Sequence, residues 1–124
     1  MDVEQLEVYK RAIALIEPVD RLASLIERQN RDQARDLRKT ARQIAPSIAE
    51  GFAKKESQKD FKRFIGISMG SSDEMITHLR QAKKSKFSGT KVETFDALIR
   101  HYKILSKQLN QLHTTLKQNL KSDL

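Results

Sequence analysis

The sequence predicts an all-α protein, an antiparallel up-down-up-down four-helix bundle formed as a single domain over residues 1–124. Three observations indicate this fold. Apolar residues recur at three- and four-residue steps along most of the chain, the chain has only four glycines and two prolines, and short polar segments separate the periodic stretches. Long helices joined by short loops favour this arrangement, because consecutive helices then lie side by side.

Composition restricts the class of protein further. The chain is 38% hydrophobic and 32% charged and has no cysteine, which excludes disulfides, thiolate chemistry and cysteine-ligated zinc. No apolar run approaches the roughly 18 residues that a membrane-spanning helix needs. The first residues are acidic, where a secretion signal would be basic and then apolar. We therefore expect a cytoplasmic protein with no membrane partner.

The first helix is expected at about residues 3–28. Its buried face is predicted from five apolar residues at helical steps: Leu6, Tyr9, Ala12, Ile13 and Ile16. Pro18 then falls inside the pattern. Because proline lacks an N–H donor and clashes with the preceding turn, we expect a kink there. Beyond the kink the apolar stripe is expected to continue on a rotated face through Leu22, Ala23 and Ile26.

The second helix is expected at about residues 32–50, with Gly51 as the residue that ends it. Its predicted buried residues are Ala34, Leu37, Ala41, Ile44, Ile48 and Phe52. Arginines repeat at four, three and four residues beside this face, at Arg31, Arg35, Arg38 and Arg42. At about 100° per residue they form one stripe. The stripe is either a solvated helix edge, partly neutralised by Asp32 and Asp36, or a polyanion-binding surface.

The third helix is expected at about residues 57–85, with Ser57 as its N-cap and Asp60 in its first turn. Its predicted buried residues are Phe61, Phe64, Ile65, Ser68, Ser72, Met75, Leu79 and Ala82. The opposite face carries Gly66 and Gly70, and a helical glycine costs about 1 kcal/mol relative to alanine. Either another backbone approaches these glycines, from a neighbouring subunit or a nucleic acid, or the chain simply tolerates them.

The fourth helix is expected at about residues 91–119, after a loop in which Thr90 serves as the cap. Its apolar residues show the most regular spacing in the chain, alternating three and four residues apart at Phe95, Leu98, Tyr102, Leu105, Leu109, Leu112 and Leu116. This heptad spacing is typical of a long seam between antiparallel helices.

The residues do not suggest catalysis, a metal site or a cofactor. The histidines, His78, His101 and His113, lie singly on two helices. A carboxylate-bridged metal bundle needs Glu-x-x-His on two helices, whereas Glu74 and His78 are four residues apart and occur once. Glu50 is best interpreted as pairing with Arg63 or with helix-end donors. We therefore expect a protein that is not an enzyme.

The positive charge is concentrated in the middle of the chain. Of a formal net charge of +8, residues 31–63 contribute ten basic against five acidic side chains, whereas the first thirty residues carry four against six. This asymmetry indicates a surface that faces a polyanion. Few aromatic residues lie among these cations, which favours backbone recognition of structured RNA or DNA over base stacking. The candidate nucleic-acid-binding residues are Arg31, Arg35, Arg38, Lys39, Arg42, Lys54, Lys55, Lys59, Lys62 and Arg63.

Three stretches carry a family resemblance. S-I-A-E-G-F at residues 47–52, D-F-K-R-F-I-G-I-S-M-G-S-S at residues 60–72 and L-E-V-Y-K-R-A at residues 6–12 resemble the bacterial 23S rRNA intervening-sequence proteins. The resemblance implies a four-helix bundle that assembles as a homopentameric ring with a basic surface. It also implies a relationship to the accessory variability proteins of diversity-generating retroelements, which bind nucleic acid and contact a reverse transcriptase.

Two functional hypotheses follow. The first is a non-enzymatic, oligomeric protein that binds the backbone of RNA or DNA through the cations named above. The second is a protein-interaction scaffold, such as an accessory protein to a reverse transcriptase, in which Gly66 and Gly70 lie at a contact between subunits.

Overall fold

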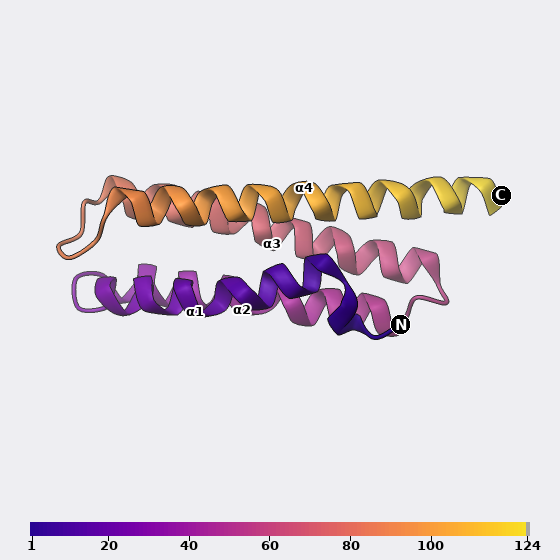
Figure 1. Ribbon diagram of the computed structural model, residues 1–124, viewed down its shortest axis with the longest axis horizontal. Coiled ribbons are helices and arrows are strands. Elements are labelled where there is room, and N and C mark those ends of the chain that lie inside the picture. The colour runs from indigo at the N-terminus through magenta and orange to yellow at the C-terminus, as the bar shows by residue number, and fades with distance from the viewer. Residues whose placement is uncertain (124) are drawn as a thin grey trace.

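The computed structural model describes the backbone of residues 1–123 and the side chains of residues 1–116. A short 3-10 turn, η1 (Val3–Gln5), precedes four helices: α1 (Glu7–Ile26), α2 (Arg31–Ala53), α3 (Gln58–Lys84) and α4 (Val92–Asp123). The described residues contain no strand. Consecutive helices run in opposite directions along one elongated molecule (Figure 1). The prediction of an all-α protein of four packed helices is confirmed.

The core runs lengthwise through the bundle, and the helices share it unequally. Each helix packs along the next one in sequence, while α1 and α4 make less contact with each other. The largest fully buried side chains include Ile26, Leu37, Ile44, Ile65, Met75, Leu79, Tyr102 and Leu109. Within the part of the chain that the structure describes, no helix is both long enough and apolar enough to cross a membrane.

The first helix begins later than predicted. Asp2 and Gln5 form a capping box around η1, and Leu6 then adopts an extended conformation with φ −73° and ψ 129°. This extended residue separates η1 from α1, so the helix begins at Glu7 and ends at Ile26.

The buried face of α1 also differs from the prediction. Ala12, Leu22, Ala23 and Ile26 are buried as predicted, but Ile13 is 44% exposed and Leu6, Tyr9 and Ile16 are only partly buried. Val8, Leu15 and Val19 complete the buried stripe. This stripe passes Pro18 at alternating four- and three-residue steps, so the predicted rotation is wrong. The reason is that α1 carries aliphatic side chains around most of its circumference, and packing against α2 and α4 selects the stripe.

Gly51 does not end α2. The helix begins after Asn30, whose side chain accepts a hydrogen bond from the Gln33 amide at 3.0 Å, and it continues to Ala53. Gly51 lies buried inside it. A Cβ at Gly51 would lie 2.8 Å from Cβ of Phe64. The glycine is therefore needed where α2 and α3 approach closely, and its predicted role as a helix-ending residue is wrong.

Small hydroxyl side chains pack α3 against α4. The predicted N-cap is confirmed, since the Asp60 amide donates to Ser57 Oγ at 3.3 Å. Ser68 and Ser72 are fully buried, as predicted. Ser72 Oγ donates to the Tyr102 carbonyl at 3.1 Å and accepts from Ser106 Oγ at 2.7 Å. These hydrogen bonds connect the two helices where small side chains let them lie close together.

The predicted apolar seam of α4 is confirmed from Phe95 to Leu109 and at Leu116, while Leu112 is only partly buried. The helix extends to Asp123, beyond the predicted end at residue 119. In the preceding loop, Thr90 Oγ1 donates to the Phe87 carbonyl at 2.6 Å.

The two loops at the α1–α2 and α3–α4 ends are joined by one side chain. Gln29 Nε2 donates to the Ser88 carbonyl at 3.0 Å, and the Ser88 amide donates to Gln29 Oε1 at 2.8 Å. We call this pair of hydrogen bonds the Gln29 clasp. It connects the α1–α2 hairpin to the α3–α4 hairpin at the end opposite the α2–α3 turn.

Replacing Gly51 tests the close approach of α2 and α3. Gly51→Ala is expected to lower the free energy of unfolding, because overpacking costs about 1–3 kcal/mol against the gain of up to about 1 kcal/mol from alanine in a helix. Gly70→Ala is the matched control. A Cβ at Gly70 meets nothing within 4 Å, so this variant is expected to be stabilised. Urea denaturation measures both, and a Gly51→Ala protein as stable as Gly70→Ala would contradict the packing.

Candidate nucleic-acid interface

The structure brings the predicted arginine stripe of α2 together. Five basic residues line one open groove with Gln43 and with Glu27, the residue that follows α1: Arg31, Arg35, Arg38, Lys39 and Arg42. Their register follows from the helix, because steps of three and four residues return to the same side. The groove lies along the first half of α2, beside α1.

Two of these arginines pair with Glu27, which follows α1, and with Asp20 of α1. Arg38 Nη1 lies 2.9 Å from Glu27 Oε1, and its Nη2 donates to Ser24 Oγ at 2.9 Å. Arg42 Nη2 lies 2.9 Å from Asp20 Oδ2. The Arg38 side chain is only 23% exposed. These two arginines therefore connect α1 to α2, and carboxylates of the same chain balance their charges.

The other three cations of the groove are more available. Arg35 Nη1 lies 3.3 Å from Asp32 Oδ1 on the same helix, in an exposed pair that solvent and salt weaken. Arg31 and Lys39 are exposed, and neither forms an ion pair with the residues that the structure describes. A polyanion at this groove would meet mainly Arg31, Lys39 and Arg35.

The second group of predicted cations surrounds the α2–α3 turn. Lys55 Nζ lies 4.0 Å from the ring centre of Phe52, and Arg63 Cζ lies 4.4 Å from that of Phe64. Lys54 Nζ lies 5.0 Å from the Phe64 ring and 3.3 Å from Glu50 Oε1. Each contact fits a cation–π arrangement. The turn therefore presents cations that rest on aromatic rings.

The contacts between these cations and the phenylalanine rings were not predicted from the sequence. Phe52, Phe61 and Phe64 were predicted as buried residues, whereas Phe52 and Phe64 are only partly buried. Phe52 and Phe61 pack edge to face, with ring centres 6.3 Å apart. The spacing of Phe52 from Lys55 by three residues in the sequence was the available signal. The predicted pairing of Glu50 is wrong. Its side chain is exposed and pairs with Lys54, and not with Arg63 or with helix-end donors.

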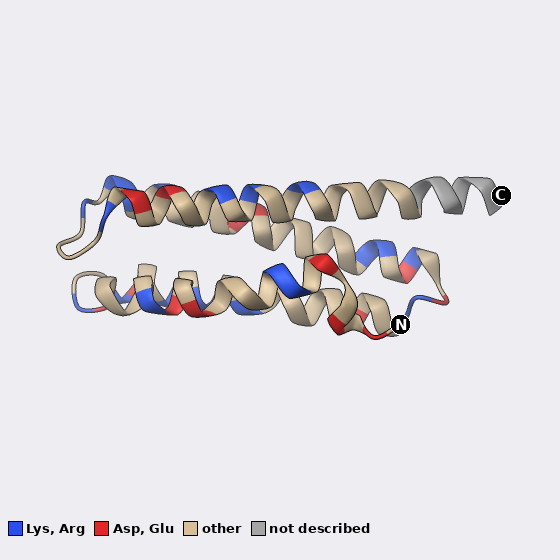
Figure 2. Ribbon diagram, in the orientation of Figure 1, with Lys and Arg blue, Asp and Glu red and all other residues tan. Residues whose placement is uncertain are grey.

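Lys59, Lys62 and Arg63 form the remaining part of the turn surface. With Asp60 they line a groove of about 380 Å³, which is also lined by Gly66 of α3 and His113 of α4. Lys59 and Lys62 form no ion pair with any residue that the structure describes. The candidate residues thus form two groups, one along the first half of α2 and one at the α2–α3 turn. Figure 2 shows basic residues on the first turns of α3, and it also shows them along α4 and in the loop before it.

The histidines and acids show no metal-binding arrangement in the described part of the chain. No three His, Asp or Glu side chains there gather closely enough to hold an ion. The predicted neighbours Glu74 and His78 do meet, with Oε1 and Nε2 3.2 Å apart.

One comparison with known proteins identifies a family. The model of the 23S rRNA-intervening sequence protein family matches residues 4–111, which confirms the resemblance found in the sequence. A comparison with curated proteins finds no match.

Replacing individual arginines separates structural from available cations. Arg38→Ala is expected to lower the free energy of unfolding by about 1 kcal/mol, because it removes hydrogen bonds to a carboxylate and a hydroxyl between two helices. Arg35→Ala, the control, is expected to change it by less than about 0.5 kcal/mol, because its partners are exposed. Urea denaturation compares them, and equal effects would contradict the distinction.

Proposed function

Because the chain belongs to the 23S rRNA-intervening sequence protein family, we propose that it is a non-enzymatic, self-associating protein that binds the phosphate backbone of structured RNA or DNA. The observation that carries this proposal is the set of available cations on the α2–α3 hairpin. Arg31, Lys39, Lys59 and Lys62 are without an acid partner among the described residues. The proposal includes a cytoplasmic location and a ring-shaped assembly, for which the resemblance favours a pentamer.

The spacing of the two groups favours a polymer over a small anion. Arg42 lies in α2, and Lys54 is the residue that follows its end, twelve residues later, which corresponds to roughly 18 Å at about 1.5 Å per residue. A single phosphate or mononucleotide cannot contact both groups. A nucleic-acid backbone can, because its charges repeat along the strand.

The contacts at the turn favour backbone recognition over base stacking. Lys55 and Arg63 already lie over the Phe52 and Phe64 rings, so the faces that a base would use are partly covered. The Lys55 and Arg63 side chains are exposed, so their positive charges are accessible at the surface of the turn. Phosphate oxygens are the groups that such cations contact without reading a sequence.

A protein-interaction scaffold is the second candidate function, with a reverse transcriptase as one such partner. The observation that favours it is a largely apolar groove of about 710 Å³ between α1 and α4, away from both cation groups. Apolar grooves between helices commonly receive a partner helix.

Salt dependence tests the proposed function. The logarithm of the affinity for a fluorescein-labelled RNA hairpin is expected to fall linearly with the logarithm of KCl concentration, with a slope of about 0.7–0.9 per phosphate contacted. Lys59→Gln/Lys62→Gln is expected to reduce that slope by about 1.5, corresponding to two lost contacts. Fluorescence anisotropy provides the measurement.

The control for this experiment removes the same charge elsewhere. Lys103→Gln/Lys107→Gln neutralises two exposed lysines of α4 that lie outside both groups. This variant is expected to keep the wild-type slope. Binding that does not respond to salt, or equal loss in both variants, would rule out the proposed interface.

A further inference from the structure

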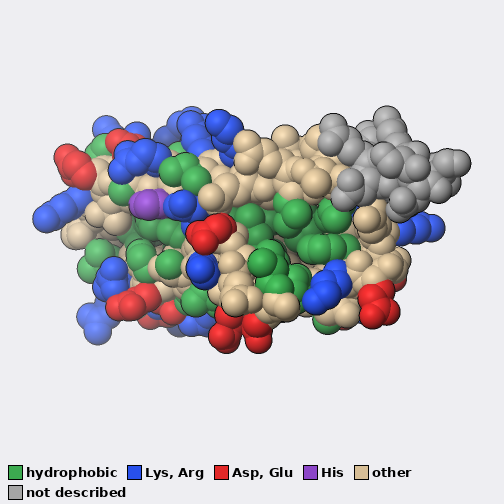
Figure 3. Space-filling model, turned by 45° about the vertical axis from the view of Figure 1, so that its right-hand side comes forward, with side chains coloured by type: hydrophobic (Ala, Val, Ile, Leu, Met, Phe, Trp, Pro, Cys, Tyr) green, Lys and Arg blue, Asp and Glu red, His purple; other side chains and the backbone are tan. Residues whose placement is uncertain are grey.

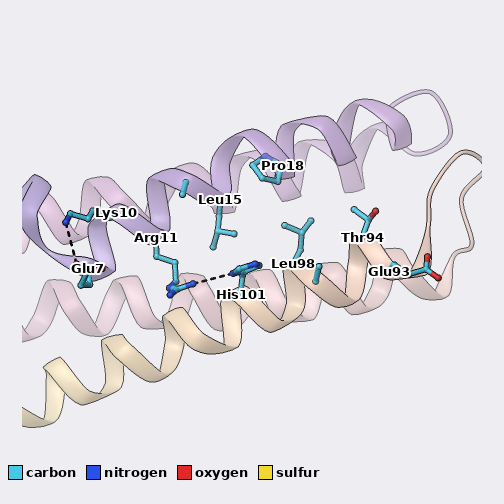
Figure 4. Close-up of a pocket in the computed structure, with 11 residues that line it drawn as sticks. Glu7, Lys10, Arg11, Leu15, Pro18, Glu93, Thr94, Leu98 and His101 are labelled. Atoms are coloured by element: carbon cyan, nitrogen blue, oxygen red, sulfur yellow. Dashed lines mark hydrogen bonds and ion pairs between the residues drawn. The ribbon is translucent and has the colours of Figure 1, made fainter.

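An apolar groove of about 710 Å³ lies between α1 and α4. Figure 3 shows hydrophobic side chains exposed between the two helices. Its lining includes Ala14, Leu15 and Pro18 from α1 and Ala97, Leu98 and His101 from α4 (Figure 4). The facing alanines contribute only methyl groups, which leaves space where larger side chains would close the seam.

Arg11 places a charge in this groove that no carboxylate balances. Its Nε donates to Gln108 Oε1 at 3.1 Å, and its Nη1 lies 3.3 Å from His101 Nδ1. Neither of these partners supplies a negative charge. Of the two acids in the lining, Glu7 pairs with Lys10 at 3.4 Å, and Glu93 lies toward the opposite end of the groove (Figure 4). The groove therefore suits an apolar partner that carries a carboxylate.

The outer face of α3 has these properties. Ile67 is 45% exposed on it. Gly70 follows three residues later, and a Cβ there would meet nothing within 4 Å. Glu74 follows four residues after that, with a side chain that is 55% exposed and contacts His78 of the same helix. The stripe thus combines an apolar projection, a place where another backbone can come close, and an acid.

We propose that α3 of a second copy of this chain docks in the α1–α4 groove, with Ile67 against its apolar lining and Glu74 paired with Arg11. The spacing fits: Ile67 and Glu74 are seven residues apart, as are Pro18 and Arg11, and each interval spans roughly 10 Å of helix. This inference rests on the self-association proposed above and identifies the two surfaces. Because they differ, the contact repeats from head to tail, which closes a ring or continues as a filament.

The shape of the groove favours a helix over a small ligand. It is open along two antiparallel helices, so a small molecule would remain largely exposed, whereas a helix can lay an apolar face along it. Gly70 adds to this preference, because a helix without a side chain at this position can approach more closely. Gly66, which was predicted at the same contact, instead faces α4 of its own chain, where a Cβ would lie 3.7 Å from the His113 ring.

Charge exchange tests the contact. Multi-angle light scattering is compared for wild type, Arg11→Glu, Glu74→Arg and the double variant. Wild type is expected to exceed the monomer mass, each single variant to associate at least tenfold more weakly, and the double variant to regain assembly because the pair is restored in reverse. Far-UV circular dichroism and urea denaturation verify that each variant is folded.

The outcomes separate this inference from the proposed function. Folded single variants with wild-type mass, or a double variant that stays dissociated, would overturn the contact. A monomeric wild type would overturn self-association itself. The Lys59→Gln/Lys62→Gln protein is expected to keep its mass while losing affinity for RNA, so a failure of RNA binding leaves the assembly result unaffected. Assembly only upon addition of a small amphipathic acid would also contradict docking of α3.

A second variant tests close approach without a change of charge. Gly70→Gln adds a neutral, helix-favouring side chain to open space on the monomer. Its urea midpoint is expected to rise while its association weakens at least fivefold, because the added side chain obstructs the contact. The control, Asn110→Gln, changes an exposed residue of α4 that lies outside both the groove and the α3 stripe, and it is expected to leave the mass unchanged. A Gly70→Gln protein that assembles normally would contradict the inference.

Discussion

The close approach of α2 and α3 at Gly51 determines much of the rest of the molecule. A Cβ there would lie 2.8 Å from Phe64 Cβ and 3.3 Å from the Phe61 carbonyl oxygen. With no side chain in the way, α2 continues past Gly51 to Ala53, and the turn brings Phe52, Phe61 and Phe64 together. The cations of the turn then rest on two of these rings. The absence of a Cβ at Gly51 thus permits both the close packing of the α2–α3 hairpin and the arrangement of the cations at its turn.

The positive charge of the sequence is divided between two physical roles. Arg38 and Arg42 bond to Glu27 and Asp20 and hold two helices together. Arg31, Lys39, Lys59 and Lys62 are left without such partners among the described residues. Asp20 of α1 and Glu27 just after it therefore neutralise one side of the arginine stripe, so the charge that the α2–α3 hairpin offers to a polyanion is smaller than its count of basic residues indicates.

Features that depend on local sequence were predictable, and features that depend on which surfaces meet were not. The Ser57 cap and most of the α4 seam were recognised from the sequence, because caps and heptads are local patterns. The face of α1 was mistaken, since aliphatic residues occupy both possible stripes. Gly51 resembled a helix end, because a close-packed glycine and a terminal one look alike in sequence. The candidate cations were identified from the sequence. Their partners were not, because the pairing of Arg38 with Glu27 and of Arg42 with Asp20 depends on how α1 and α2 pack.

The Gln29 clasp has a mechanical consequence for the seam between α1 and α4. The side-chain amide of Gln29 donates one hydrogen bond to the Ser88 carbonyl and accepts another from the Ser88 amide, as a backbone peptide group would. These hydrogen bonds thus connect the two hairpins at the loop end. The α2–α3 turn connects them covalently at the other end, and α2 and α3 pack against each other along their length. The seam between α1 and α4 is therefore fastened at two places along its length, by the clasp at the loop end and by Arg11, whose Nε donates to Gln108 Oε1, near the first turns of α1.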